Sequence, residues 1–170
     1  MKRGVALDAA FVLQTPKGER VISAEDYFVG PDIDITRLNI LRPGDLLSSI
    51  RIPPMWAGAR FYFEKIRDRA VWDFPLLNVA SAMTLSGDRI ERIRIAVNAV
   101  AARPLRLAAV ERAVTGKANS AATGEMAGNL AVQGAVPLQF NSYKIPLMRN
   151  LVKRAVAGEQ EATWTSYSGQ

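Results

Sequence analysis

The chain has 170 residues, of which 49% are hydrophobic and 22% charged. This composition is typical of one soluble globular domain, or of one domain and part of a second. The absence of cysteine excludes disulfides, thiol nucleophiles and iron–sulfur clusters held by this chain. The absence of histidine removes the commonest metal ligand and the base of a Ser-His-Asp triad. We therefore expect no metal site and no catalytic residue of the chain's own.

The charge balance is basic, with 22 Lys and Arg against 16 Asp and Glu and a net charge of +6. Such a balance suits nucleic acid or another polyanionic ligand. The basic residues are scattered, however, and the densest stretch, residues 89–94, alternates with isoleucines like the solvated face of a strand. No nucleic-acid-binding motif accompanies them, so we expect a basic surface and no nucleic-acid partner, with nucleic-acid binding as the less favoured alternative.

No segment approaches the roughly 18 consecutive apolar residues of a membrane-spanning helix. Asp8 interrupts the apolar N-terminus too early for a signal peptide. We expect no membrane contact and a cytoplasmic location, with export on a partner's signal as the alternative.

The first part of the chain reads as strands and turns. An extended segment at 5–13, a turn at 15–19 and a second extended segment at 20–22 predict a hairpin. Ser23 resembles the N-cap of a short helix ending near Phe28. Residues 46–52 predict a strand, which Pro53 and Pro54 stop.

The second part changes from strands to helices. Residues 61–67 predict an extended segment, and 77–85 with 93–99 predict an antiparallel hairpin. A helix is predicted from Pro104 to Gly116, a weak helix within 118–135, and a strong helix that ends at Gly158. The last helix carries an apolar stripe, formed by Tyr143, Leu147, Met148, Leu151, Val152, Ala155 and Val156. The predicted class is α+β, with helices on one side of a small antiparallel sheet.

Two short motifs suggest ligand sites only weakly. Asp32 and Asp34 lie in a loop without further oxygen ligands, so a solvated loop is the preferred interpretation. Residues 124–128, GEMAG, lack the lysine and the preceding strand of a phosphate-binding loop.

Five motifs, in order and spacing, carry a resemblance to a known family. They are EDYF at 25–28, LRPGDLL at 41–47 running into IRIP at 50–53, FEKIR at 63–67, WDFPLLNVA at 72–80, and NSYKIPL with LVKRA at 141–155. Together they resemble the FAD-binding medium subunit of the molybdenum hydroxylases, the xanthine dehydrogenase, aldehyde oxidoreductase and carbon monoxide dehydrogenase enzymes.

The resemblance implies a domain plan. Residues 1–53 would be the C-terminal part of an FAD-binding (PCMH-type) domain, 57–158 a C-terminal domain of the carbon monoxide dehydrogenase flavoprotein type, and 159–170 a loose tail. FAD would take electrons from iron–sulfur clusters and molybdopterin on a small and a large partner subunit, in a hetero-oligomer. The isoalloxazine would pack against Leu47, and Lys65 would face the flavin edge.

The chain departs from the family pattern at the cofactor's phosphates. In the family, glycine-rich loops hold the FAD pyrophosphate, and this sequence contains no pair of consecutive glycines. We therefore interpret the chain as a truncated or split subunit that retains little FAD by itself. The alternative is a docking or assembly module that has lost FAD binding. We expect a partner to contact the region 28–40 and the strand 46–52.

Overall fold

The computed structural model describes residues 2–69, 73–133, 143–158 and 165–166. In chain order its elements are α1 (Lys2–Ala6), β1 (Ala10–Thr15), β2 (Gly18–Ser23), β3 (Leu46–Arg51), the 3-10 turn η1 (Pro54–Trp56), β4 (Arg60–Arg67), β5 (Leu77–Ser86), β6 (Arg89–Asn98), β7 (Leu105–Arg106), α2 (Ala108–Val114), α3 (Ala121–Val132), α4 (Lys144–Ala157) and β8 (Thr165–Ser166).

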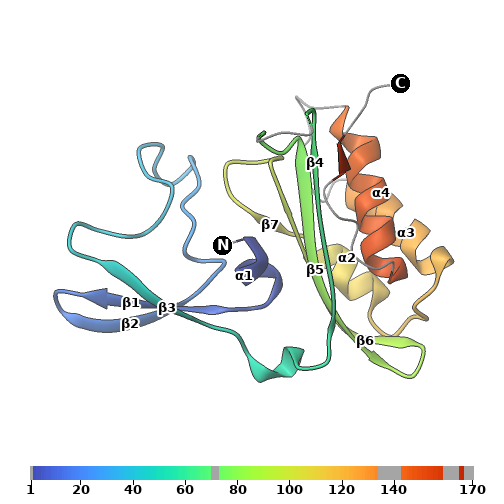
Figure 1. Ribbon diagram of the computed structural model, residues 1–170, viewed down its shortest axis with the longest axis horizontal. Helices are drawn as coiled ribbons and strands as arrows, with labels where there is room; N and C mark the ends of the chain where they lie inside the picture. The colour runs from blue at the N-terminus through green and yellow to red at the C-terminus, as the bar shows by residue number, and fades with distance from the viewer. Residues whose placement is uncertain (1, 70–72, 134–142, 159–164, 167–170) are drawn as a thin grey trace.

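The strands form two sheets (Figure 1). β2, β1 and β3 make an antiparallel sheet, which with α1 forms what we call the N-terminal lobe, residues 2–51. β7, β6, β5, β4 and β8 make a second sheet, in which β8 runs parallel to β4 and the other neighbours are antiparallel. We call residues 60–158 the sheet–helix lobe. The sheets are antiparallel apart from β8, and with the packed helices they confirm the predicted α+β class.

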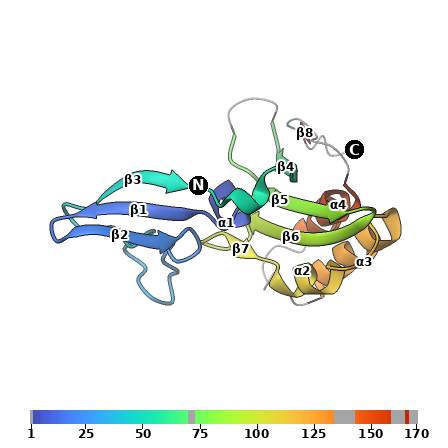
Figure 2. The ribbon, with the colours of Figure 1, turned by 90° about the horizontal axis from the view of Figure 1, so that it is seen from below.

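The helices lie on opposite faces of the larger sheet (Figure 2). α2, α3 and α4 cover one face, while α1 and the N-terminal lobe lie against the other (Figure 1). The larger core lies under the three helices, and its fully buried side chains include Leu77, Ile90, Ile93, Ile95, Val110, Met148 and Leu151. The predicted strand at 61–67, the predicted hairpin of 77–85 with 93–99, and the last helix are confirmed. Tyr143, however, is exposed and does not belong to the apolar stripe.

Two predictions for the N-terminal lobe are wrong. The segment from Val5 does not begin a strand, because residues 2–6 form α1 and the strand starts at Ala10. The residues after Ser23 form turns instead of a helix. The Ser23 hydroxyl does accept a hydrogen bond from the Asp26 amide at 3.1 Å, but this local bond closes one turn and no helix follows it.

Two helix predictions also need correction. α2 begins at Ala108 instead of Pro104, because Leu105 and Arg106 pair with β6 as a short edge strand. The region predicted to be a weak helix holds a twelve-residue α-helix, α3. Its Gly124 and Gly128 face α4 so closely that a Cβ at Gly128 would lie 2.5 Å from the Arg149 carbonyl oxygen. The small residues that weaken helix propensity thus allow close helix packing.

The change between sheets occurs at η1, beside the predicted domain boundary. The lobes share contacts, so the division into residues 1–53 and 57–158 stays a prediction. Of the predicted tail, only residues 165–166 lie within the described residues, where they pair with β4. Among the described residues, the helices are too short or too polar to span a bilayer.

Candidate functional site

β4 carries the sequence motif FEK at 63–65 and presents different chemistry on its two faces. Glu64 is buried on the helix side, where its carboxylate pairs with Arg154 of α4. Phe63 packs instead against the core of the N-terminal lobe. Because successive side chains of a strand point to opposite faces, Lys65 lies on the same face as Phe63, toward the N-terminal lobe.

Lys65 is half-buried, and the loop after β4 holds its ammonium. Its Nζ donates a hydrogen bond to the Asp73 carbonyl oxygen at 2.7 Å. The Asp73 carboxylate accepts hydrogen bonds from Arg69 at 3.2 Å and from the Phe74 amide at 2.9 Å. The bond from Arg69 lowers the pKa of Asp73 from its usual value, so this loop keeps a carboxylate near the Lys65 anchor.

Cross-strand pairing places Lys65 in a polar row of the sheet. Lys65 lies opposite Asn78 on β5, and Asn78 lies opposite Asn98 on β6. The next row on this face contains Phe63, Ala80 and Ala96. The face that meets the N-terminal lobe therefore changes from apolar to hydrogen-bonding groups within one step along the strands. Asn78 is buried, and the sequence reasoning missed both asparagines.

Leu47 lies on β3, opposite Leu13 of β1. It is half-buried and packs on the same apolar cluster as Phe63 does, a cluster that contains Phe11, Leu13, Tyr27, Ala80 and Ala96. The two predicted site residues thus belong to strands that meet one core, on the same side of the larger sheet. Their roles toward a flavin stay a prediction.

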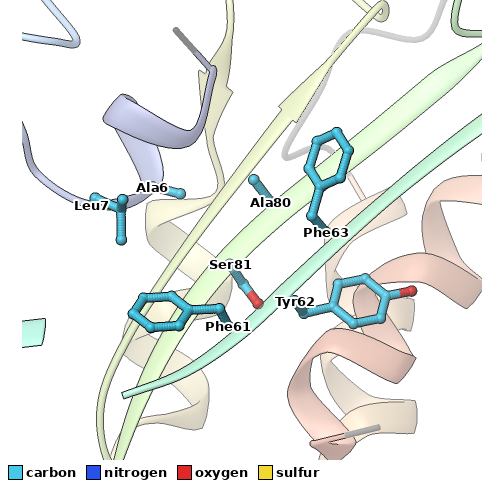
Figure 3. A pocket seen from close by; sticks show the side chains of 7 residues that line it. All are labelled: Ala6, Leu7, Phe61, Tyr62, Phe63, Ala80 and Ser81. Carbon is cyan, nitrogen blue, oxygen red and sulfur yellow. The ribbon is translucent and has the colours of Figure 1, made fainter. Parts of the chain in front are cut away.

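A pocket of about 290 Å³ opens beside this core (Figure 3). Ala6 and Leu7 of the N-terminal lobe and Phe61, Tyr62, Phe63, Ala80 and Ser81 of β4 and β5 line it. The Phe61 ring points toward Leu7, whereas the Tyr62 ring points away toward the helices (Figure 3). Leu47 and Lys65 do not line the pocket. Phe63 does line it, lies two residues before Lys65 on β4, and packs on the same apolar cluster as Leu47. The lining is mostly apolar, which is typical of small-molecule sites.

Glu64 and Arg154 are a second feature that the sequence reasoning missed. Glu64 is 1% exposed, and the Tyr62 hydroxyl donates a hydrogen bond to one carboxylate oxygen. Arg154 donates to the other at 2.9 Å. The sequence does carry a signal for this pair. Glu64 alternates with Tyr62 and Ile66 on the apolar face of β4, and a charge buried on such a face requires a partner.

Comparison with known proteins identifies the fold of the larger lobe. A model of the "CO dehydrogenase flavoprotein C-terminal domain" matches residues 61–158, more than half of the chain. The chain belongs to this family. The match contains Lys65 and the Glu64–Arg154 pair, whereas Leu47 precedes it.

The chain is also similar to named family relatives. The carbon monoxide dehydrogenase medium chain of Hydrogenophaga pseudoflava is 29% identical over 156 residues, which cover 89% of this chain and 52% of the relative. The aldehyde oxidoreductase FAD-binding subunit PaoB of Escherichia coli K12 is 33% identical over 106 residues, 62% of this chain and 32% of the relative. The chain spans about half, or less, of the length of these curated relatives.

Solved structures of family members extend the similarity into the N-terminal lobe. A carbon monoxide dehydrogenase from Hydrogenophaga pseudoflava matches with a TM-score of 0.77 and 29% identity, over 92% of this chain and 54% of the matched chain. A Cu,Mo-CO dehydrogenase matches with a TM-score of 0.73 and 27% identity, over 91% of this chain and 54% of the other. Both lobes therefore share their arrangement with these structures.

Proposed function

We propose that this chain is part of the FAD-binding, electron-transferring subunit of a molybdenum-containing hydroxylase or dehydrogenase. The observation that carries the proposal is the family match over residues 61–158, which includes Lys65. The relatives support it, since they include an FAD-binding subunit and medium chains of carbon monoxide dehydrogenase. The similar structures include a Cu,Mo-CO dehydrogenase.

The residues present suit one end of FAD. The half-buried Leu47 offers an aliphatic surface against which the face of a flat ring can pack. The Lys65 ammonium is a cation and donor on the same side of the larger sheet, and it would favour negative charge on the reduced ring. The pyrophosphate end needs several oriented backbone amides. The family's glycine-rich loops would supply these amides, and this sequence contains no pair of consecutive glycines. We therefore assign Leu47 and Lys65 to the isoalloxazine end.

Bound FAD supplies redox chemistry between the iron–sulfur clusters of a partner and a final acceptor. In this proposal, molybdopterin belongs to a large partner subunit and the clusters to a small one. Exposed aliphatic side chains support a partner surface on the N-terminal lobe: Ile33 is 70% exposed, Ile35 82% and Leu38 74%. Such a group of exposed apolar residues favours association, and it falls in the segment predicted to contact a partner.

Fusion to the other half of a relative tests the proposal. We would replace the matching C-terminal half of the Hydrogenophaga pseudoflava medium chain with this chain and measure flavin absorbance after purification. The expected result is one FAD per fusion protein. The unfused chain is the control and should hold little flavin, because the family's phosphate-binding loops are not within it. A folded fusion without flavin would contradict the proposal and favour a docking or assembly module.

A further inference from the structure

A network of charged side chains joins the two lobes. The carboxylate of Asp8, which lies two residues after the end of α1, is 2.8 Å from Arg94 Nε on β6 and 3.3 Å from Arg106 Nη1 on β7. Glu111 of α2 lies 2.5 Å from Arg106, and Glu25 of the N-terminal lobe lies 3.5 Å from it. We call these five residues the inter-lobe clamp. Its contacts join residues 86 and 98 positions apart in the sequence.

The backbone at Asp8 adopts a conformation that is usual for glycine. α1 ends with hydrogen bonds from the Ala9 amide to the Gly4 carbonyl at 2.9 Å and from the Asp8 amide to the Val5 carbonyl at 3.4 Å. This pattern places a left-handed residue after the helix, usually glycine. Asp8 occupies it with a φ of 48°. Glycine would meet the backbone requirement with less strain, but it would not supply a carboxylate.

Four of the five clamp residues are more shielded from water than an ordinary surface ion pair, whereas the Glu25 side chain is 53% exposed. The side chains of Arg94, Arg106 and Asp8 are 27%, 20% and 25% exposed, and that of Glu111 is 6% exposed. Charges interact more strongly where water is partly excluded. Burial opposes the charge of Arg106, but its hydrogen bond with Glu111 and the charges of Glu111, Asp8 and Glu25 outweigh burial and raise its pKa.

The clamp also lies on the face that carries the candidate site. Arg106 pairs across the sheet with Ala96, and Ala96 pairs with Ala80, which pairs with Phe63. The small side chains of Ala80 and Ala96 leave a flat surface against α1. The ion pairs and hydrogen bonds of the clamp add directional contacts between the two lobes. Beside Asp8, the buried Trp56 indole donates a hydrogen bond to the Leu7 carbonyl at 2.8 Å.

We propose that Asp8 and Arg106 are positioning residues whose shared ion pairs fix the orientation of the N-terminal lobe against the sheet–helix lobe. If the proposed function holds, this orientation sets the place of Leu47 relative to Lys65, and the clamp acts on the flavin only through these residues. The clamp itself rests on contacts within this chain and can be tested without flavin.

The absence of cysteine permits a direct measurement. Lys17 and Met126 are exposed and lie in different lobes, so a cysteine at each position would carry one spin label per lobe. Pulsed electron paramagnetic resonance would then give the distribution of distances between the two labels. The labelled protein with an intact clamp should give one narrow distribution of label-to-label distances. Asp8→Asn keeps the shape and the tolerance of a left-handed backbone but removes the charge, so the distribution should broaden or shift. Arg106→Met should do the same.

The control is Arg37→Met, which removes an ion pair with Asp34 that lies within the N-terminal lobe. Its distribution should match that of the unmodified chain. Circular dichroism would establish folding, and if a clamp variant fails to fold, Arg94→Met replaces it, since this variant removes the other ion pair of Asp8 and should also broaden the distribution. Distributions that stay narrow and unshifted in these clamp variants would overturn the proposal. A broadened distribution together with a fusion protein that lacks flavin would contradict the proposed function alone.

Discussion

The Arg154 guanidinium on α4 lies 2.9 Å from the buried carboxylate of Glu64 on β4, 90 residues earlier in the chain. This pair fixes the C-terminal helix to the strand that carries Lys65. Glu64 faces the helices while the neighbouring Lys65 faces the N-terminal lobe. The burial of Glu64 therefore helps to define which face of β4 each side chain occupies.

Arg154→Met should destabilise the protein by about 3 kcal/mol, because it removes a partner from a charge that stays buried. Urea unfolding followed by circular dichroism would measure the loss. The neighbouring Lys153→Met is the control: it removes the more exposed ion pair with Glu125 and should cost less than about 1 kcal/mol. Equal losses for the two variants would show that burial of Glu64 does not strengthen its dependence on Arg154.

Gly128→Ala should also destabilise the protein, although alanine is the better helix former by roughly 1 kcal/mol. The new methyl group would meet the backbone of α4 at 2.5 Å, so the helices would have to separate. We expect a net loss of about 1–3 kcal/mol from overpacking, measured by thermal or urea unfolding. Met126→Ala, at a partly exposed position of the same helix, should be nearly neutral. A more stable Gly128→Ala variant would contradict the close packing of α3 and α4.

Asp34 should titrate at about pH 2, because hydrogen bonds from the Thr36 side chain, from Arg37 and from the Thr36 amide lower its pKa from 3.8. Since the folded pKa is depressed, the stabilisation from this carboxylate is present above the unfolded pKa and is lost as the pH falls toward 2. Carboxyl carbon shifts in NMR spectra would give the titration. Thr36→Val should raise the pKa of Asp34, and an unchanged pKa would exclude the hydroxyl as a cause.

The sequence predicts strands best where local patterns and long-range packing agree. Residues 77–85 and 93–99 alternate and are joined by a turn at Gly87, which has a φ of 63° and so suits glycine. The strong last helix ends at Gly158, also in the left-handed region, with a φ of 77°. In both places the turn chemistry and the apolar pattern indicate the same structure.

The failures occur where distant contacts decide the local structure. Arg94 was predicted to lie on a solvated strand face, but Asp8, 86 residues earlier, pairs with it. The glycines of α3 reduce helix propensity, and only the position of α4 shows why they are tolerated. Single-sequence patterns do not contain such pairings.

The candidate site could be predicted in part. The family motifs indicate Leu47 and Lys65, and the structure places both on strands that meet one apolar core. The polar row of Lys65, Asn78 and Asn98 could not be read from the sequence, because the register between β4, β5 and β6 brings these residues together.

Leu47→Ala in the fusion protein should weaken FAD binding by roughly 1–3 kcal/mol through lost apolar contact. A titration of the flavin-free fusion with FAD, followed by flavin fluorescence, would measure the change. Leu46→Ala is the matched control, since Leu46 is on the same strand but 65% exposed, and it should have the smaller effect. Equal effects of the two variants would contradict the assignment of Leu47.

The reduction potential of FAD bound to the fusion protein tests the central claim most directly. If Lys65 faces the flavin edge, Lys65→Met removes a cation that favours the reduced, more negative ring, so the potential should fall. Lys117→Met is the charge-matched control and should leave the potential unchanged, because Lys117 lies beside the start of β6, at the opposite end of that strand from Asn98 in the row of Lys65. A potential that falls only in Lys65→Met, with flavin still bound, is the predicted result. Equal potentials in both variants would contradict the proposal that this chain contacts the flavin through Lys65.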